Sequence, residues 1–266
     1  MGATIGREKE VESLAPREEA LQAGNVFITG HGGDRINAYQ AVSGEDGPRP
    51  GVLVIHHLPG WDSTTKEITR RFAATGYNAI CPNLYAREGI DVDPDDAAAA
   101  ARAKGGVGDE QFLGDASGAI DALRFLPNSN GRVGVIGYCS GGRQSFLTAI
   151  SLPVDAAVDC YGAFVTGTIP DGFPLKVVPL VDRTSSLRCP LLGLFGADDQ
   201  FPTPEHVAEL EQALIAEGKT YEFHTYDGAG HAFFSTDRPS YRPEAALDGW
   251  QRIFSWFDMY LTPSEA

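Results

Sequence analysis

From residue 52 onward, short apolar runs alternate with longer segments in which the apolar residues fall on one face. The runs predict strands at 52–56, 78–81, 133–136, 156–160, 190–195 and 221–226. The longer segments predict helices near 64–75, 110–126, 142–151, 204–217 and 244–260. Apolar strands between amphipathic helices predict an α/β fold, with a mostly parallel central sheet that carries helices on both faces.

The first 50 residues follow a different pattern. Residues 8–23 are charged and compatible with a helix, which predicts an N-terminal arm or helix over residues 1–24. Residues 25–42 predict a β-hairpin with a glycine-rich turn. We therefore expect an arm at residues 1–24, followed by a single domain at residues 25–266.

Two long segments, 88–108 and 164–188, lack a clear period. Long connections in an α/β domain often carry binding residues, so we expect both to lie over the active site. The alanine run at 97–101, inside the first segment, predicts a solvent-exposed helix.

The composition limits the kinds of partner. Hydrophobic residues make up 42% of the 266 positions, and 36 acidic against 21 basic residues give a net charge of −15. This charge argues against nucleic acids and anionic membranes as partners, and an anionic substrate would need a local arginine. No run approaches the ~20 apolar residues of a membrane span, and the N-terminus lacks the apolar core of a secretory signal. We therefore expect a cytoplasmic protein.

The four cysteines, at positions 81, 139, 160 and 189, do not form a Cys-x-x-Cys pair. Because no His/Cys cluster has the spacing of a zinc site, neither a metal nor another cofactor is expected. Cys81, Cys160 and Cys189 lie in strand-like apolar contexts and are expected to be buried, without a disulfide. The expected partner is a small-molecule substrate, and the protein is expected to be a monomer or a small homo-oligomer.

Cys139 has a different setting. Residues 137–142 read Gly-Tyr-Cys-Ser-Gly-Gly and lie between the predicted strand at 133–136 and the predicted helix at 142–151. A strand, a Gly-x-nucleophile-x-Gly turn and a helix resemble the nucleophile elbow of α/β-hydrolases. The glycines fit because so tight a turn brings neighbouring backbone against the flanking positions. Cys139 stands where the nucleophilic serine usually is, so a thiol nucleophile is predicted.

Elbow enzymes carry the acid and then the base after the nucleophile in the chain. Asp199 follows the strand predicted at 190–195, and His231 follows the strand predicted at 221–226. Both therefore lie at the sheet edge where open α/β sheets bind ligands. Asp199 is the preferred acid because it occupies the last position of a G-x-x-D loop, and the adjacent Asp198 remains the alternative.

An ester or lactone attacked by the Cys139 thiolate would form a tetrahedral oxyanion. The backbone N–H of Ser140 and that of Leu58, in the loop after the central strand, are the expected donors to this oxyanion. His231 would hold or take the thiol proton, and Asp199 would fix the tautomer of the imidazole.

The chain resembles the dienelactone hydrolase family, the carboxymethylenebutenolidases, although its first 50 residues do so only weakly. The matching segments lie between about Gly51 and Leu261 and are 81–87, 129–142, 160–162, 196–202 and 230–233. The resemblance implies an α/β-hydrolase fold and hydrolysis of ester or lactone bonds through a cysteine nucleophile.

The resemblance also implies substrate-binding residues. Arg87, in a matching Tyr-Ala-Arg segment with Tyr85, corresponds to an arginine that binds the substrate carboxylate. A surface ion pair of Arg87 with a neighbouring acid is the alternative. The second carboxylate-binding arginine of the family aligns with Ser235, and Arg238, three residues later, is the candidate replacement.

Two adjacent histidines follow the central strand. His57 stands where the family has a glutamate that activates the cysteine, and we expect it to face the substrate, as a second base or a hydrogen-bond donor. A role as an ordinary loop residue is the alternative. His56 is expected to point into the sheet.

Three functions remain open at this point. The first is a cysteine hydrolase of esters or lactones similar to dienelactone hydrolase. The second is a broad-specificity carboxylesterase or thioesterase of the same fold. The third is a catalytically idle protein of that fold that binds a ligand or partner, since a fold alone does not decide function.

Overall fold

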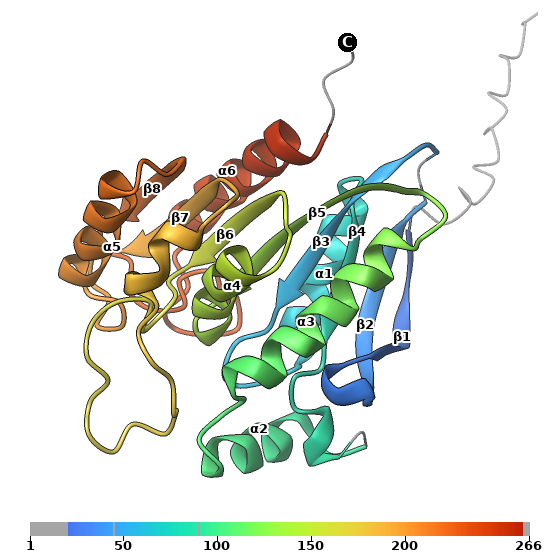
Figure 1. Ribbon diagram of the computed structural model, residues 1–266, viewed down its shortest axis with the longest axis horizontal. Coiled ribbons are helices and arrows are strands. Elements are labelled where there is room, and N and C mark those ends of the chain that lie inside the picture. The colour runs from blue at the N-terminus through green and yellow to red at the C-terminus, as the bar shows by residue number, and fades with distance from the viewer. Residues whose placement is uncertain (1–20, 45, 90, 263–266) are drawn as a thin grey trace, which may run out of the picture.

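One sheet runs through the residues that the computed structural model describes, 21–44, 46–89 and 91–262. Its strands are β1 (Leu21–Thr29), β2 (Arg35–Ser43), β3 (Arg49–Ile55), β4 (Asn78–Pro82), β5 (Ser129–Tyr138), β6 (Ala156–Cys160), β7 (Leu191–Gly196) and β8 (Tyr221–Tyr226). Their order in this eight-stranded sheet is β1-β2-β4-β3-β5-β6-β7-β8 (Figure 1). The pairs β1–β2 and β2–β4 are antiparallel, and the other pairs are parallel. The predicted mostly parallel α/β sheet is thus confirmed.

Helices cover both faces of the sheet (Figure 1). The α-helices of the described residues are α1 (Ser63–Ala74), α2 (Pro94–Ala103), α3 (Asp109–Arg124), α4 (Ser140–Ser151), α5 (Pro204–Ala216) and α6 (Pro243–Leu261). Short 3₁₀ turns are η1 (His31–Gly33), η2 (Ala86–Glu88) and η3 (Val181–Ser186). Buried residues of α3, α4 and α5 belong to one core cluster, and those of α1 and α6 belong to the other.

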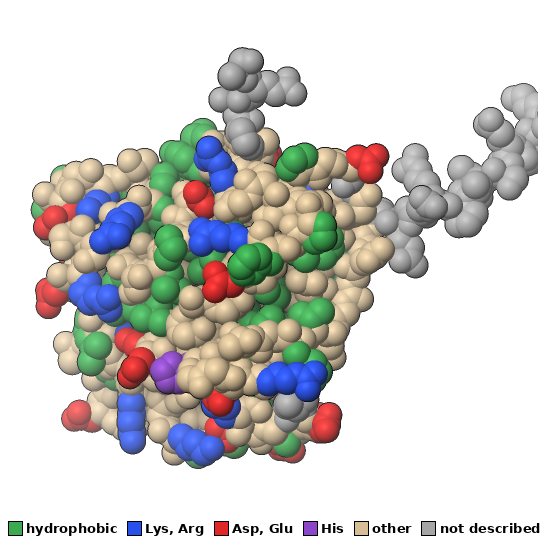
Figure 2. Space-filling model, turned by 45° about the vertical axis from the view of Figure 1, so that its right-hand side comes forward, with side chains coloured by type: hydrophobic (Ala, Val, Ile, Leu, Met, Phe, Trp, Pro, Cys, Tyr) green, Lys and Arg blue, Asp and Glu red, His purple; other side chains and the backbone are tan. Residues whose placement is uncertain are grey.

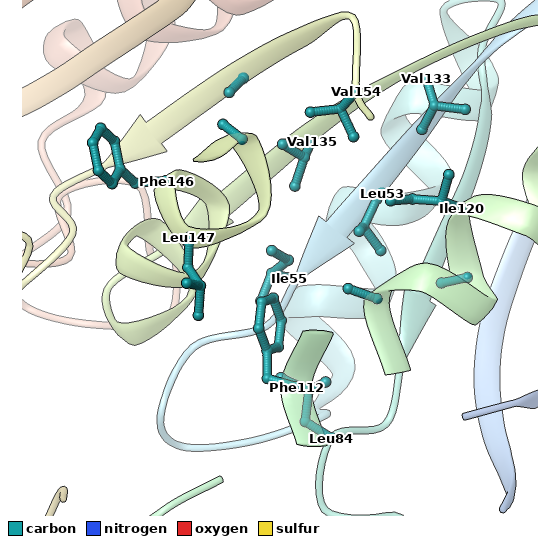
Figure 3. Packing of buried hydrophobic residues seen from close by; sticks show 14 of the residues in the cluster. Leu53, Ile55, Leu84, Phe112, Ile120, Val133, Val135, Phe146, Leu147 and Val154 are labelled. Atoms are coloured by element: carbon teal, nitrogen blue, oxygen red, sulfur yellow. The ribbon is translucent and has the colours of Figure 1, made fainter. Parts of the chain in front are cut away.

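The central strands are apolar on both faces because each face has its own core. Leu53 of β3 is fully buried in the cluster that contains Phe112 of α3 (Figure 3). The preceding residue, Val52, is fully buried in the opposite cluster, with Phe72 of α1 and Phe257 of α6. Complete burial of such a side chain contributes roughly 1.5–3 kcal/mol relative to exposure. The strands are therefore apolar throughout because helices cover the sheet on both sides.

The N-terminal boundary differs from the expectation. The predicted hairpin is present, but β1 begins at Leu21, so residues 21–24 are part of the sheet rather than of the arm. Backbone pairing with residues 40–43 of β2 decides this conformation, whatever the side chains favour. The rest of the predicted arm, residues 1–20, lies outside the described residues.

The alanine run is helical as predicted, but only part of it is solvent-exposed: Ala99 is exposed, and Ala100 is half-buried. Ala97, Ala98 and Ala101 of α2 are buried in the same core cluster as Phe112. Small side chains allow a helix to lie close to its support, so an alanine-rich face can be buried without a large apolar signal. Helix α2 thereby occupies the middle of the first long segment.

The parallel strands bring the ends of β3, β5, β6, β7 and β8 to one edge of the sheet, where the predicted site residues follow them. On the face seen in Figure 2, acidic and basic side chains are interspersed among apolar ones. Within the described ranges, no helix has both the length and the apolar character to cross a membrane.

Candidate active site

Cys139 sits at a sharp turn between β5 and α4. Its backbone has φ 58° and ψ −122°, a conformation that non-glycine residues rarely adopt and that carries strain. A Cβ on Gly137 would lie 1.9 Å from the carbonyl oxygen of Gly141, and one on Gly141 would lie 2.6 Å from that of Ile55. Backbone contacts this close explain why glycine occupies the positions two residues before and two residues after the strained cysteine.

His231 and Asp199 meet at the same edge. The imidazole Nδ1–H donates to Asp199 Oδ2 over 2.9 Å, and Asp199 Oδ1 accepts the backbone N–H of Phe201 over 2.8 Å. Asp199 is buried, whereas its neighbour Asp198 is exposed and makes no such bond to the imidazole. The structure therefore brings Asp199, the preferred acid, to His231.

The Cys139 thiol is hydrogen-bonded to His231. Burial by itself would raise the pKa of Cys139, but the hydrogen bond and charge of His231 outweigh it and lower that pKa. For His231, burial would lower the pKa, yet the bonds to Asp199 and Cys139 raise it well above its usual value. Both changes favour a thiolate beside an imidazolium.

Two backbone N–H groups point to the same sulfur. Those of Ser140 and Leu58 donate hydrogen bonds toward Cys139 and help to lower its pKa. Tyr85 holds the Leu58 loop in place, because its buried hydroxyl donates to the Leu58 carbonyl over 2.9 Å. The structure thus places the two expected oxyanion donors and Tyr85 together at the nucleophile.

These groups open into a cavity of about 360 Å³. Both long segments contribute to its wall, as the sequence predicted, through residues 106–107 and residues 163–177. The apolar lining residues are Leu58, Leu84, Tyr85, Val107, Ala163, Phe164, Phe173, Leu175, Val177 and Phe201. The polar lining residues include Cys139, Ser140, Arg143, Gln144, Asp198, Asp199, Gln200 and His231. A mainly apolar cavity of this size is typical of a small-molecule site.

The structure does not bring Arg87 to this cavity, which corrects the sequence-based expectation. Its guanidinium donates to both oxygens of the fully buried Asp115, over 2.8 and 3.0 Å, and to Asp34 over 2.8 Å. The alternative, an ion pair, is what the structure shows. Its partners are Asp34, directly after η1, and Asp115 of α3, rather than acids next to Arg87 in the sequence. A buried carboxylate is costly without a cation, so Arg87 is committed to Asp115.

The two adjacent histidines have exchanged their expected positions. His56 lines the cavity, whereas His57 lines a separate small cavity with Tyr138 and Ser235. Consecutive residues of an extended segment point in opposite directions, which explains how the assignment could be reversed. The expectation that His57 faces the substrate is therefore wrong.

Neither histidine is free to act as a base on the thiol. His56 donates from Nδ1 to the His57 carbonyl over 2.8 Å and accepts the Leu84 N–H at Nε2 over 3.2 Å. Burial lowers the pKa of His56 to about 4, so the ring is neutral. His57 Nε2 bonds to Asp62 over 2.5 Å; burial opposes ionisation of Asp62, but this bond and those from Thr65 lower its pKa to about 2.

The residues aligned with the second arginine also lie away from the cavity wall. Ser235 is buried behind it and bonds to Tyr161, and the exposed Arg238 is not among the lining residues. Within the described residues, no cluster of three or more His, Cys, Asp or Glu could hold a metal ion.

Arg143 and the three phenylalanines that line the cavity, Phe164, Phe173 and Phe201, were not identified from the sequence. Arg143 lies in the first turn of α4, so its closeness to Cys139 could have marked it. Phe164 and Phe173 stand in the long segment predicted to cover the site, where aromatic residues were an available signal.

Comparison with known proteins identifies a family and several relatives of this chain. A sequence model of the dienelactone hydrolase family matches residues 36–261. A carboxymethylenebutenolidase of Pseudomonas putida is 34% identical over 75% of this chain and 81% of its own length. A protein of Escherichia coli (strain K12) named "Putative carboxymethylenebutenolidase" is 38% identical over 91% of this chain and 89% of its own length.

Solved structures show the same architecture. One titled "Putative Dienelactone Hydrolase", from Klebsiella pneumoniae, has a TM-score of 0.79 at 34% identity and covers 91% of this chain and 100% of its own. An acylaminoacyl peptidase, at 16% identity and a TM-score of 0.70, shares the fold over 93% of this chain and 43% of its own.

Proposed function

This chain belongs to the dienelactone hydrolase family, and we propose that it cleaves carboxylic ester or lactone bonds with the Cys139 thiolate as nucleophile. The observation that carries the proposal is the arrangement of Cys139, His231 and Asp199 at one cavity wall, with the Leu58 and Ser140 N–H groups beside the sulfur.

The resting site is a thiolate next to an imidazolium. Asp199 accepts the Nδ1–H of His231, which leaves Nε2 facing the sulfur and stabilises the positive charge on the ring. The lowered pKa of Cys139 supports this state, because the thiolate is the reactive form of cysteine.

Acylation begins when the thiolate attacks the carbonyl carbon of the substrate. The new C–S bond pushes electrons onto the carbonyl oxygen, and the N–H groups of Leu58 and Ser140 stabilise that oxyanion. When the intermediate collapses, the C–O bond to the alcohol breaks and His231 gives its proton to the leaving oxygen. The products of this step are a thioester on Cys139 and an alcohol, which stays attached to the acyl group if the substrate is a lactone.

Deacylation reverses the roles of the same groups. Neutral His231 takes a proton from water, and the resulting hydroxide attacks the thioester carbon. The second oxyanion uses the same two N–H groups, and its collapse expels the Cys139 thiolate with release of the acid. The imidazolium is then restored, so all atoms and charges of the resting site return.

Replacement of the nucleophile tests the proposal. Cys139→Ala should lower kcat/KM for an aryl acetate and for a simple lactone by roughly 10⁴-fold or more. Cys189→Ala is the matched control, because that buried thiol lies outside the cavity and its loss should leave the rate nearly unchanged.

Intact-mass measurement during turnover gives a second readout. The wild-type chain and Cys189→Ala should carry one acyl group, and Cys139→Ala should carry none. Unchanged hydrolysis by Cys139→Ala would overturn the proposal.

A further inference from the structure

We propose that the cavity selects neutral esters with an aromatic or other apolar group and rejects substrates that carry a carboxylate. This inference rests on the proposed function, because it concerns which esters reach Cys139. It comes from the charges and the side chains that surround the cavity.

Arg143 is the only arginine or lysine among the described residues that line the cavity, and its charge is already matched. Its two terminal nitrogens donate to the two oxygens of Asp109 over 2.7 and 2.9 Å, and one of them also donates to the Val178 carbonyl over 2.7 Å. The Arg143 side chain is only 3% exposed. These bonds occupy both terminal nitrogens, so neither is left for a substrate carboxylate. The remaining donor, Nε–H, has no partner among the described residues, but it is buried and is a single donor rather than a fork.

Other cations lie near the cavity without lining it. Arg102 of α2 acts on Tyr85: burial raises the pKa of that hydroxyl, and the charge of Arg102 partly offsets the rise. Lys176 lies between the lining residues Leu175 and Val177, but its own side chain is exposed. Neither is among the lining residues, so neither provides a buried contact for an anion.

Negative groups, in contrast, do line the cavity. Asp198 and Asp199 are both part of its wall. The imidazolium of His231 is balanced by Asp199 on one side and by the thiolate on the other. A substrate carboxylate would lose its water, gain no cation and lie near other anions, which is strongly unfavourable.

Three phenylalanines form an aromatic patch within the apolar wall. The rings of Phe164 and Phe173 are 4.7 Å apart at 74°, and Phe201 lies 5.6 Å from the first and 6.0 Å from the second. All three line the cavity. Rings at these distances and angles offer edges and faces to a further flat ring, which favours an aryl ester.

A matched substrate pair tests the inference. para-Acetoxyacetophenone and para-acetoxybenzoate release similar phenols, but only the second carries a carboxylate. With each rate divided by that of uncatalysed hydroxide hydrolysis, kcat/KM should favour the neutral ester by at least about 30-fold. Equal values, or a preference for the anion, would overturn the inference while the proposed function stands. Failure to hydrolyse either ester would overturn the proposed function and this inference with it.

Asp109→Asn tests the cause of the preference. It leaves the charge of Arg143 unmatched, so the preference for the neutral ester should shrink by roughly fivefold, mainly through a lower KM for the anion. Asp121→Asn is the matched control, since it removes the same charge from an exposed position on the same helix, away from the cavity. Equal effects of the two variants would show that only net charge matters and would overturn the role of the Asp109–Arg143 pair.

Arg102→Gln tests whether Arg102, which lies near the cavity, binds an anionic substrate instead. The inference expects the ratio of the two kcat/KM values to stay within about twofold of wild type, because Arg102 has no buried contact with the substrate. A selective loss of activity toward the anionic ester would identify Arg102 as an anion-binding residue and overturn the inference.

Discussion

Two buried carboxyl groups come from neighbouring parts of the sheet, Asp159 from β6 and Asp199 from the loop after β7, and their surroundings differ. On the cavity side, each oxygen of Asp199 has a partner, His231 for one and the Phe201 N–H for the other. In contrast, the fully buried Asp159 of β6 accepts one N–H, from Gly162 over 2.7 Å. Its other oxygen has no hydrogen-bond partner among the described residues.

The difference shows that the neighbour, rather than burial, decides what a buried acid does. Asp199 faces a cation and raises the pKa of His231, which serves the chemistry. Asp159 faces none, and burial raises its own pKa to about 7, an effect that the Gly162 N–H only partly offsets. Asp115 provides a third case, since it is fully buried but paired with Arg87.

Among substitutions of these acids and their partners, removal of the Asp199 charge should have the largest effect on activity. Asp199→Asn is expected to lower kcat by roughly 10³-fold, because His231 loses the anion that stabilises its protonated form. The pKa of His231 should fall, so the alkaline limb of the rate profile, where the imidazolium is lost, should move to lower pH. Steady-state rates over a pH series check both effects.

The neighbouring acid provides the comparison for that experiment. Asp198→Asn should change kcat by less than about tenfold, since Asp198 is exposed and makes no bond to His231. If the larger loss followed Asp198→Asn, the assignment of the acid would be reversed.

Removal of a cation should turn a paired buried acid into an unpaired one. Arg87→Met leaves Asp115 with only the His31 N–H, as Asp159 has only Gly162, and should lower the free energy of unfolding by about 3 kcal/mol. Urea denaturation measures this loss, and kcat for a neutral ester should stay within about twofold of wild type.

Arg35→Met is the matched control. It removes an exposed arginine of β2 that lies over Phe27, and it should cost less than about 1 kcal/mol. The opposite pattern for Arg87→Met, a raised KM for an anionic ester with unchanged stability, would restore the substrate-binding role that the sequence suggested.

Replacement of the unpaired acid by a neutral isostere should change how stability depends on pH. Asp159 has a pKa of about 7 in the folded chain against 3.8 ordinarily, so the folded state holds one more proton between about pH 4 and 7. Stability from this group is therefore complete below about pH 4 and declines as the pH rises to about 7. Asp159→Asn keeps the neutral form, so it should be more stable than wild type by roughly 4 kcal/mol at pH 8 and nearly equal at pH 4.

Thermal or urea unfolding of both chains over this range measures the difference. A constant gap between the two curves would mean that Asp159 does not titrate between these limits.

The smallest effect is expected from replacement of His57, which bonds to Asp62 and does not line the main cavity. His57→Gln should lower stability by about 1 kcal/mol through the lost bond to Asp62, and should change kcat by less than about threefold. The acid limb of the rate profile should not move. A shift of that limb would show that His57 acts on the reaction after all.

Much of the fold was predictable because its signals are local. Apolar runs reflect the two-sided burial of β3 to β7, and the glycines around Cys139 reflect backbone contacts within the turn itself. The meeting of Asp199 and His231 followed from the rule that parallel strands end at one edge. Their catalytic roles stay predictions.

The errors concern side chains whose partners lie far away in the chain. Asp115 gives no local sign that it is buried and will bind Arg87, because it sits on a helix whose inward face is set by packing against the sheet. The directions of His56 and His57 depend on the turn of one loop, which a sequence pattern does not specify. Burial of α2 was missed because alanine contributes little to an amphipathic pattern.

The contacts of Arg87 also bear on how the molecule opens. Its guanidinium touches Asp34 at the turn of the edge hairpin and Asp115 of α3, and it extends from η2 after β4. Asp34 is exposed, but the hairpin also gives the His31 N–H to the buried Asp115, so separation of these segments would take partners from a buried charge. We therefore expect them to exchange their amide hydrogens as one cooperative unit. The edge hairpin should therefore resist local fraying and limited proteolysis far better than an edge position in a sheet would suggest.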